Sequence, residues 1–407
     1  MIIGINATAA LRQPRTGVEE YTYQLIKHLT MLPEAKEHRF FLYVPSFEKG
    51  GLGRILKISP TPFFLKRGEN NPLDFPLPEN FEIKVLRWPL SFLWTQIRLA
   101  WEMRRRSPKI LFIPVHILPF GAPKNSVVAI HGLEYEYWPQ YYPWWHRLYL
   151  RWSTKRAVRR AKKIIAISAN TKQDLIKLYG AETEKIDVVY HGISSNKNYV
   201  ISARFAKAPA RRAKAGIQDS GCRIKSGMTI TKPYILYIGR VETKKNIQGL
   251  LEAYKVLKEE YNIPHQLVLA GAPGHGHKAL RRALRACSGE NVLELGYISE
   301  DEKWQLLGGA DVFAFPSFYE GFGLPVLEAQ ISGVPVVCSD GSSLREIAGQ
   351  GALFVNPQNN TQIAEAIKQV IDDNVLRDRL RQSGEENVKR FSWEKCAKET
   401  LEALIKQ

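Results

Sequence analysis

The chain has 407 residues, 44% of them hydrophobic, so it is long enough for two globular domains and has the apolar share of a soluble protein. No run of about 18 uncharged apolar residues occurs, and the start lacks a basic segment before a long apolar core, so neither a membrane-spanning helix nor a signal peptide is expected. The four cysteines lie far apart without a CxxC motif, which argues against a metal site or disulfide framework and favours a reducing cytoplasm.

The formal charge of +18 is unevenly placed. Residues 140–163 hold eight Lys or Arg and no acid, interleaved with six tyrosines and tryptophans, and residues 98–109 add a second basic cluster around Trp101. Such surfaces attract phosphorylated ligands, anionic lipid head groups or nucleic acid. A solvated helix face explains much of the same pattern and stays open as the alternative.

Short β-branched runs alternate with amphipathic segments along the first half, as in parallel sheets built from βαβ units. Helices are expected in segments such as 18–29 and 171–178. The expected strands are 2–7, 39–44, 82–88, 109–115, 126–132, 163–168 and 186–192.

The alternation restarts after residue 230, with strands expected at 233–240, 265–271, 291–297, 311–317, 334–340 and 352–356. We therefore predict two doubly wound α/β domains in tandem, over residues 1–200 and 231–391. Residues 201–230 read as a basic linker or insertion, because residues 202–229 contain seven basic residues, one acid and no clear apolar period. A helix at about 392–407 is expected to pack back onto the first domain.

Two loops of the second domain carry candidate chemistry, since ligands of doubly wound sheets bind beyond the carboxyl ends of the strands. In YIGRVETKKN, Gly239 permits a turn, and Arg240 and Lys245 could converge on one diphosphate. Alone, this pattern is weak, because basic residues at a helix start are usually just solvated.

The second loop is FPSFYEGFGLPVLEAQISGVPVVCSD, residues 315–340, in which a strand meets a helix starting at Leu324. Gly323 allows close backbone approach, and the unpaired amides at the helix start favour a phosphate. Glu320 then lies at the reactive end of the ligand, and Glu328, inside the helix, can accept both hydrogens of a ribose diol. In the alternative reading, Glu320 only complements the helix dipole and Glu328 is a surface acid.

These residues resemble the retaining glycosyltransferases of family 4, which have the GT-B fold of two Rossmann-like domains facing across a cleft. The motif E-G-F-G-L-P-x-L-E followed by G-V-P-V-V carries the resemblance, together with PYILYIGRVETKKN, VLELGYISEDEKWQLLGGADVFAFPS and FSWEKCAKETL. It covers nearly the whole chain. It implies that the first domain binds the acceptor and the second binds a nucleotide sugar.

The resemblance also implies roles for single residues. Glu320 would hold hydroxyls of the donor sugar, Glu328 would hold the ribose, and Arg240 and Lys245 would stabilise the leaving diphosphate. The remaining donor-binding positions would be Gly17, Gly239, Tyr297, Ile298, Phe322, Gly323 and Leu324, with Tyr297 and Ile298 flanking the base. No cofactor and no metal are expected, because no Asp-x-Asp motif lies near these loops and the two cations can supply the positive charge.

In the first domain, His131 matches the family position at which a histidine reaches the donor sugar, although Gly132 follows where the family often has aspartate. His116 and His191 also end strand-like runs and are expected to be packed residues. Ser168 is expected to cap a helix. A single glycine, Gly17, stands where many members have two, which we associate with mannosyl- or rhamnosyl-type enzymes.

The sequence therefore predicts transfer of a hexose, mannose-type favoured, from a GDP- or UDP-linked donor to a glycan or lipid-linked acceptor. Cytoplasmic location is expected, with peripheral attachment to an anionic membrane surface. Three alternatives stay open: a nucleotide-sugar epimerase of similar fold, a phosphorylase, and a non-enzymatic membrane- or nucleic-acid-binding protein. Binding to nucleic acid would leave the Glu320 loop without purpose and is disfavoured.

Overall fold

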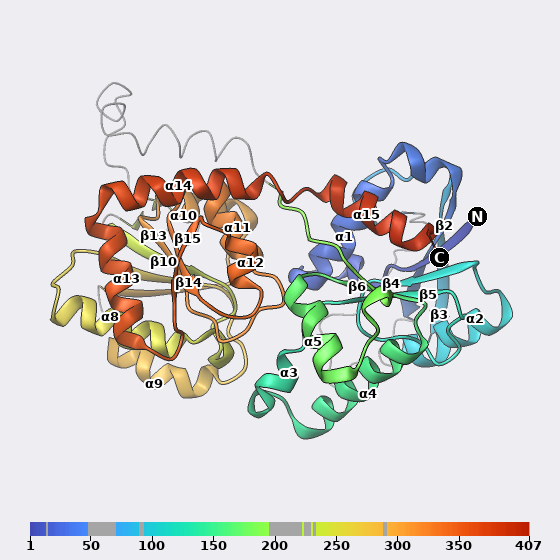
Figure 1. The fold of residues 1–407 in the computed structure, drawn as a ribbon, viewed down its shortest axis with the longest axis horizontal. Helices are drawn as coiled ribbons and strands as arrows, with labels where there is room; N and C mark the ends of the chain where they lie inside the picture. Colours follow the sequence, from blue (N-terminus) through green and yellow to red (C-terminus); the bar gives the residue numbers. More distant parts are fainter. Residues whose placement is uncertain are drawn as a thin grey trace. The chain divides into compact units, whose positions relative to one another are not determined.

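The computed structural model of the chain contains two compact units (Figure 1). The first comprises residues 1–137, 142–192 and 391–407, and the second comprises residues 138–141 and 193–390. The residues that the structure describes are 1–13, 15–47, 71–88, 93–194, 222–223, 229–230, 233–287 and 291–406. Most of the predicted linker, 201–230, lies outside the described residues. Within it, β8 (Cys222–Arg223) pairs with β9 (Thr229–Ile230) in an antiparallel ribbon.

The described part of the first unit is built on a seven-stranded parallel sheet in the order β3-β2-β1-β4-β5-β6-β7. The central strands are almost wholly buried, as expected for a parallel sheet covered on both faces. The strands are β1 (Ile2–Asn6), β2 (Arg39–Phe47), β3 (Phe81–Trp88), β4 (Ile110–Ile113), β5 (Ser126–Ile130), β6 (Lys163–Ala166) and β7 (Ile186–Val188).

Alternate residues of these strands enter two separate cores. Ile110 and Phe112 of β4 belong to one hydrophobic cluster, and Leu111 and Ile113 belong to the other, because successive side chains of a strand point to opposite faces. The helices that cover the sheet are α1 (Gly17–Leu29), α2 (Ala100–Arg105), α3 (Glu134–Tyr137), α4 (Trp144–Arg160), α5 (Ala169–Tyr179) and α15 (Trp393–Ile405), with a π-helix at Trp94–Leu99.

The C-terminal helix α15 packs beside α1 in the first unit (Figure 1). Trp393 and Cys396 share a buried cluster with Tyr21 and Leu25 of α1. Gly192 lies so close to Trp393 that a Cβ at this position would be 2.1 Å from the Trp393 amide nitrogen. Helix α5 begins as predicted, because Ser168 accepts a hydrogen bond from the Thr171 amide at 3.1 Å.

The second unit contains, in its described part, a six-stranded parallel sheet in the order β12-β11-β10-β13-β14-β15. The strands are β10 (Tyr234–Ile238), β11 (Gln266–Ala270), β12 (Val292–Gly296), β13 (Val312–Phe315), β14 (Val336–Ser339) and β15 (Ala352–Val355). The helices are α8 (Ile247–Glu259), α9 (His277–Cys287), α10 (Glu300–Gly309), α11 (Leu324–Ile331), α12 (Leu344–Ala348), α13 (Asn360–Asp372) and α14 (Asn374–Val388). The prediction of two doubly wound α/β domains is confirmed.

Candidate active site

The second sheet reverses its strand order between two neighbouring strands, β10 and β13. From β10 the sheet continues to β11 and β12 on one side, and from β13 to β14 and β15 on the other. In open α/β sheets, ligands bind in the crevice outside the carboxyl ends of the strands at such a point. The loops after β10 and β13, residues 239–246 and 316–323, therefore flank the candidate site.

These two loops are tied together by backbone contacts. The Phe318 amide donates to the Lys244 carbonyl at 3.2 Å and so joins the two loops. The second loop is also held by Ser339 at the end of β14, whose Oγ donates to the Ser317 carbonyl at 2.6 Å. Below them, the buried Tyr237 hydroxyl donates to the Arg240 carbonyl at 2.9 Å. Burial raises the pKa of Tyr237 well above its usual value, and the negative charges of nearby Glu320 and Glu242 add to the rise. The buried Tyr237 hydroxyl thus holds the backbone of the first loop at Arg240.

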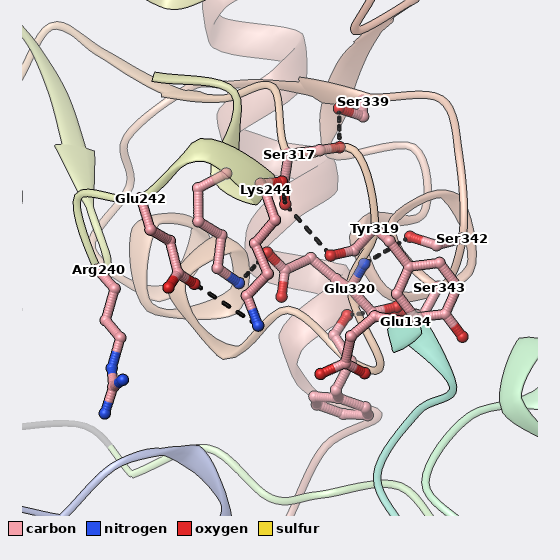
Figure 2. A network of polar contacts seen from close by, with 12 residues as sticks. Glu134, Arg240, Glu242, Lys244, Ser317, Tyr319, Glu320, Ser339, Ser342 and Ser343 are labelled. Carbon is pink, nitrogen blue, oxygen red and sulfur yellow. Dashed lines mark hydrogen bonds and ion pairs between the residues drawn. The ribbon is translucent and has the colours of Figure 1, made fainter. Parts of the chain in front are cut away.

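The predicted pair Lys245 and Glu320 is brought together. Lys245 Nζ donates to Glu320 Oε1 at 2.5 Å, and both side chains are largely buried, with 17% and 12% exposed. The Glu320 backbone is fixed as well: its amide donates to Ser342 Oγ at 3.0 Å, and its carbonyl accepts from Ser343 Oγ at 2.9 Å (Figure 2). A charge-assisted hydrogen bond therefore joins the two loops at the crevice.

Arg240 was expected to act together with Lys245, but unlike Lys245 its side chain does not contact Glu320. Its side chain is exposed and points away from the contact between Lys244 and Glu242, whose Nζ and Oε1 atoms are 3.6 Å apart (Figure 2). Gly239 before it has φ +152°, and a Cβ there would lie 2.7 Å from the Tyr237 hydroxyl, so the position favours glycine. The guanidinium has no ion pair with any described residue, so it can meet an anion.

Helix α11 begins at the predicted glycine turn. Gly323 is the N-cap with φ +115° and no side-chain cap, and Leu324 is the first helical residue. Phe322 is only 4% exposed, and its carbonyl lies 2.8 Å from Ser343 Oγ, so it shares the single Ser343 hydroxyl proton with the Glu320 carbonyl. The first turn of α11 contains no acid, so its amides can serve an anionic ligand.

Glu328, one turn into α11, is held by a residue that the sequence reasoning missed. Lys303 of α10 donates to Glu328 Oε1 at 2.6 Å and contacts Glu300 Oε2 at 2.7 Å. The two residues expected to flank a base, Tyr297 and Ile298, lie just before α10, the helix that contains Lys303. Tyr297 is 65% exposed, and Ile298 packs against the core of the second unit.

His131 and Gly17 belong to the first unit. His131 is half-buried; its Nε2–H donates to the Pro114 carbonyl at 2.6 Å, and its amide donates to His116 Nε2 at 3.2 Å. Burial, followed by the repulsion of His116, lowers the pKa of His131 to about 3, so the ring is neutral at pH 7. Burial also lowers the pKa of His116 and of His191, which stacks on Tyr21. Gly17 is the first residue of α1.

Among the described residues, no group of three or more His, Cys, Asp or Glu side chains is arranged to hold a metal ion. No helix in the described part of the chain is both long and apolar enough to cross a membrane.

Two family models match the chain: "Glycosyltransferase Family 4" over residues 15–197 and "Glycosyl transferases group 1" over residues 223–387. The chain is 29% identical over 406 residues to O-antigen chain mannosyltransferase B of Escherichia coli, covering 98% of each chain. It is 25% identical over 290 residues to O-antigen chain mannosyltransferase RfbU of Salmonella typhimurium, covering 71% of each.

Solved structures of similar fold include HepE of Anabaena in complex with UDP and glucose, with a TM-score of 0.65 and 16% identity over 99% of this chain and 98% of that one. Another is WaaG, a glycosyltransferase involved in lipopolysaccharide biosynthesis, with a TM-score of 0.66 and 15% identity over the whole of both chains. The shared architecture is GT-B, with two Rossmann-like domains.

Proposed function

Because this chain belongs to the group 1 glycosyl transferases of family 4, we propose that it is a retaining hexosyltransferase that needs no metal ion. It moves a mannose-type sugar from a nucleoside diphosphate to a hydroxyl group of a glycan or lipid-linked acceptor. Two relatives named as O-antigen mannosyltransferases support the choice of sugar and of a glycan product. The epimerase, phosphorylase and non-enzymatic alternatives gain no such support.

The observation that carries the proposal is the contact of Lys245 with Glu320 at the point where the strand order reverses. A lysine ammonium has three donors, so Lys245 can hold the Glu320 carboxylate and a phosphate oxygen at the same time. Glu320 in turn can accept hydrogen bonds from sugar hydroxyls. One ion pair thus couples the position of the hexose to the position of the diphosphate.

The leaving diphosphate would be bound by three kinds of donor. Arg240 offers a forked guanidinium, Lys245 a point charge, and the start of α11 at Gly323 and Leu324 offers backbone amides. As the glycosidic bond breaks, negative charge grows on the phosphate and an oxocarbenium-like positive charge grows on the sugar. Fixed donors stabilise this transition state more than the ground state, and they supply the positive charge that a metal would otherwise provide.

The acceptor hydroxyl would approach from the face of the departing diphosphate, and a phosphate oxygen would take its proton. This route gives retention of configuration without a separate protein base. The contact of His131 with the donor sugar and the place of Gly17 are proposed from the resemblance alone. Since His131 is neutral at pH 7, it would act there as a hydrogen-bonding group and not as a cation.

Donor choice and activity test the proposal together. Of GDP and UDP, the one that contains the base of the donor should raise the melting temperature of the protein, because a ligand that binds only the folded form stabilises it. The matching sugar nucleotide should be hydrolysed slowly or transferred to an acceptor, with GDP-mannose the first choice. Glu320→Ala should abolish transfer, whereas Lys255→Met, in an exposed pair with Glu259 on α8, should not. An active Glu320→Ala variant would refute the assigned site.

We place the enzyme at the inner face of the cytoplasmic membrane because of the surface of α4. This helix contains six Lys or Arg and no acid, and its exposed apolar residues include Trp144 at 75%, Trp145 at 57% and Leu148 at 54%. Tryptophans with nearby arginines and lysines suit the interface of an anionic bilayer. In a flotation assay with anionic liposomes, the wild-type protein should float with the liposomes, and the double variant Trp144→Ser/Trp145→Ser should remain in the soluble fraction. Val375→Ser changes another exposed apolar residue, 80% exposed, and is the control that should float like the wild type.

A further inference from the structure

Lys303 joins two helices that contribute different parts of the nucleoside site. It lies in the first half of α10, a helix that begins two residues after Ile298, whereas its partner Glu328 lies on α11. Its Nζ is 2.6 Å from Glu328 Oε1 and 2.7 Å from Glu300 Oε2. The elements proposed to meet the base and the ribose are therefore connected by one ammonium group.

This contact is more than a surface ion pair. The side chains of Lys303 and Glu328 are only 14% and 15% exposed, while Glu300 is 77% exposed. Burial disfavours the ammonium, but the charges of Glu328 and Glu300 outweigh it and raise the pKa of Lys303 above its usual value. Lys303 therefore carries its charge at neutral pH.

Both helices are also anchored by apolar residues in the core of the second unit. Helix α10 is anchored by Trp304, Leu306 and Leu307, which are buried, and α11 is anchored by Val326 and Ala329 in the same core. The ammonium group instead fixes one oxygen of the Glu328 carboxylate. Among the described residues, no hydrogen bond reaches the other oxygen, Oε2.

We propose that Lys303 is a positioning residue for donor binding: it holds the Glu328 carboxylate so that Oε2 faces the ribose diol of the nucleotide. The inference rests on the proposed function, which assigns the ribose to Glu328. Without Lys303, Glu328 can rotate toward solvent, and the diol loses an oriented acceptor. The contribution of the diol to binding should then depend on Lys303.

The test compares a nucleoside diphosphate with its 2′,3′-dideoxy counterpart by calorimetry, using GDP or UDP, whichever stabilises the wild-type protein. Removing the hydroxyls should weaken binding to the wild-type protein about 10- to 100-fold, the range for hydrogen bonds to a charged group. In Lys303→Met the same change should weaken binding about threefold or less. Lys303→Arg should restore most of the difference, and Lys255→Met should behave as wild type.

A Lys303→Met protein that still discriminates against the dideoxy nucleotide as strongly as wild type would overturn the inference alone. A wild-type protein that binds neither nucleotide would overturn the proposed function and this inference with it. Circular dichroism and the melting temperature report whether each variant is folded. If Lys303→Met does not fold, Lys303→Gln, which keeps a hydrogen-bond donor without the charge, is used in the same comparison with the same criteria.

Discussion

Replacing Lys245 by methionine separates the structural and chemical roles of its contact with Glu320. Both side chains are more than four-fifths buried, and the charged groups are 2.5 Å apart, so the contact lies between a surface pair and a fully buried one. Loss of one hydrogen bond to a charged group should cost about 2 kcal/mol of unfolding free energy. For a domain of about 200 residues, this lowers Tm by about 4–8 °C.

The same substitution should lower kcat about 100- to 1,000-fold, the usual loss when one preorganised donor is removed from a transition state. The double variant Lys245→Met/Glu320→Gln tests whether the two effects separate. Because it leaves no unpaired buried charge, it should recover all but about 1 kcal/mol of stability while transfer stays lost. Lys255→Met, in a pair 59% and 65% exposed, should change stability by less than about 0.5 kcal/mol.

Differential scanning calorimetry gives Tm for the wild type, the three variants above and the single variant Glu320→Gln, which completes the double-mutant cycle. Release of nucleoside diphosphate from the sugar nucleotide gives the rate. Two results would refute the reasoning. Additive losses of stability in the double variant would show that Lys245 and Glu320 do not stabilise each other. A Lys245→Met protein with wild-type kcat would show that the ammonium takes no part in the reaction.

Two further predictions concern conformation and pH. The folded pKa of His131, about 3, lies below the usual 6.5, so the first unit should lose stability as pH falls from 6.5 toward 3, by up to about 1.4 kcal/mol per pH unit. Urea unfolding at several pH values should show that the unfolding free energy of His131→Gln depends less steeply on pH than that of the wild type. An equally steep dependence in the variant would contradict the burial of this ring. Gly323→Ala should lower the unfolding free energy by about 1–3 kcal/mol and weaken nucleotide binding, because φ is +115° and the new Cβ would lie 2.7 Å from Leu344 Cδ2. Gly341→Ala is the control and should change neither, because its Cβ would have no atom within 4 Å. Equal effects of the two substitutions would contradict the strain at Gly323.

The fold could be predicted because its central strands leave little ambiguity. Fully buried parallel strands are short, continuous apolar runs, and Tyr234–Ile238 and Val312–Phe315 appear in the sequence as such runs between loops. The start of α11 was predicted too, since a glycine before an apolar helix is a local signal. Most boundaries shifted by one or two residues, as in the run 334–340, which forms a strand over Val336–Ser339. Two ends shifted further: the run 186–192 forms a strand only over Ile186–Val188, and the strand that starts at Arg39 continues past residue 44 to Phe47.

Contacts between distant residues could not be predicted in the same way. Lys303 is separated from Glu328 by a strand and a loop, and their contact exists only because α10 and α11 pack on neighbouring strands of one sheet. Arg240 and Lys245 were treated as equivalent cations, but the conformation of the loop brings Lys245 to Glu320 and leaves Arg240 exposed. A single sequence contains no local signal for either difference.

The charges of the second unit are distributed so that lysines and glutamates near the crevice occur in pairs. Lys244 contacts Glu242, Lys245 contacts Glu320, and Lys303 contacts Glu328. Each pair is nearly neutral as a unit, so a paired lysine adds less to the field at a bound diphosphate than an unpaired cation would. Arg240, exposed and without an ion pair to any residue that the structure describes, supplies the uncompensated positive charge. Donor affinity should therefore depend chiefly on Arg240 and the α11 amides, while the paired lysines determine how the bound donor is oriented for reaction.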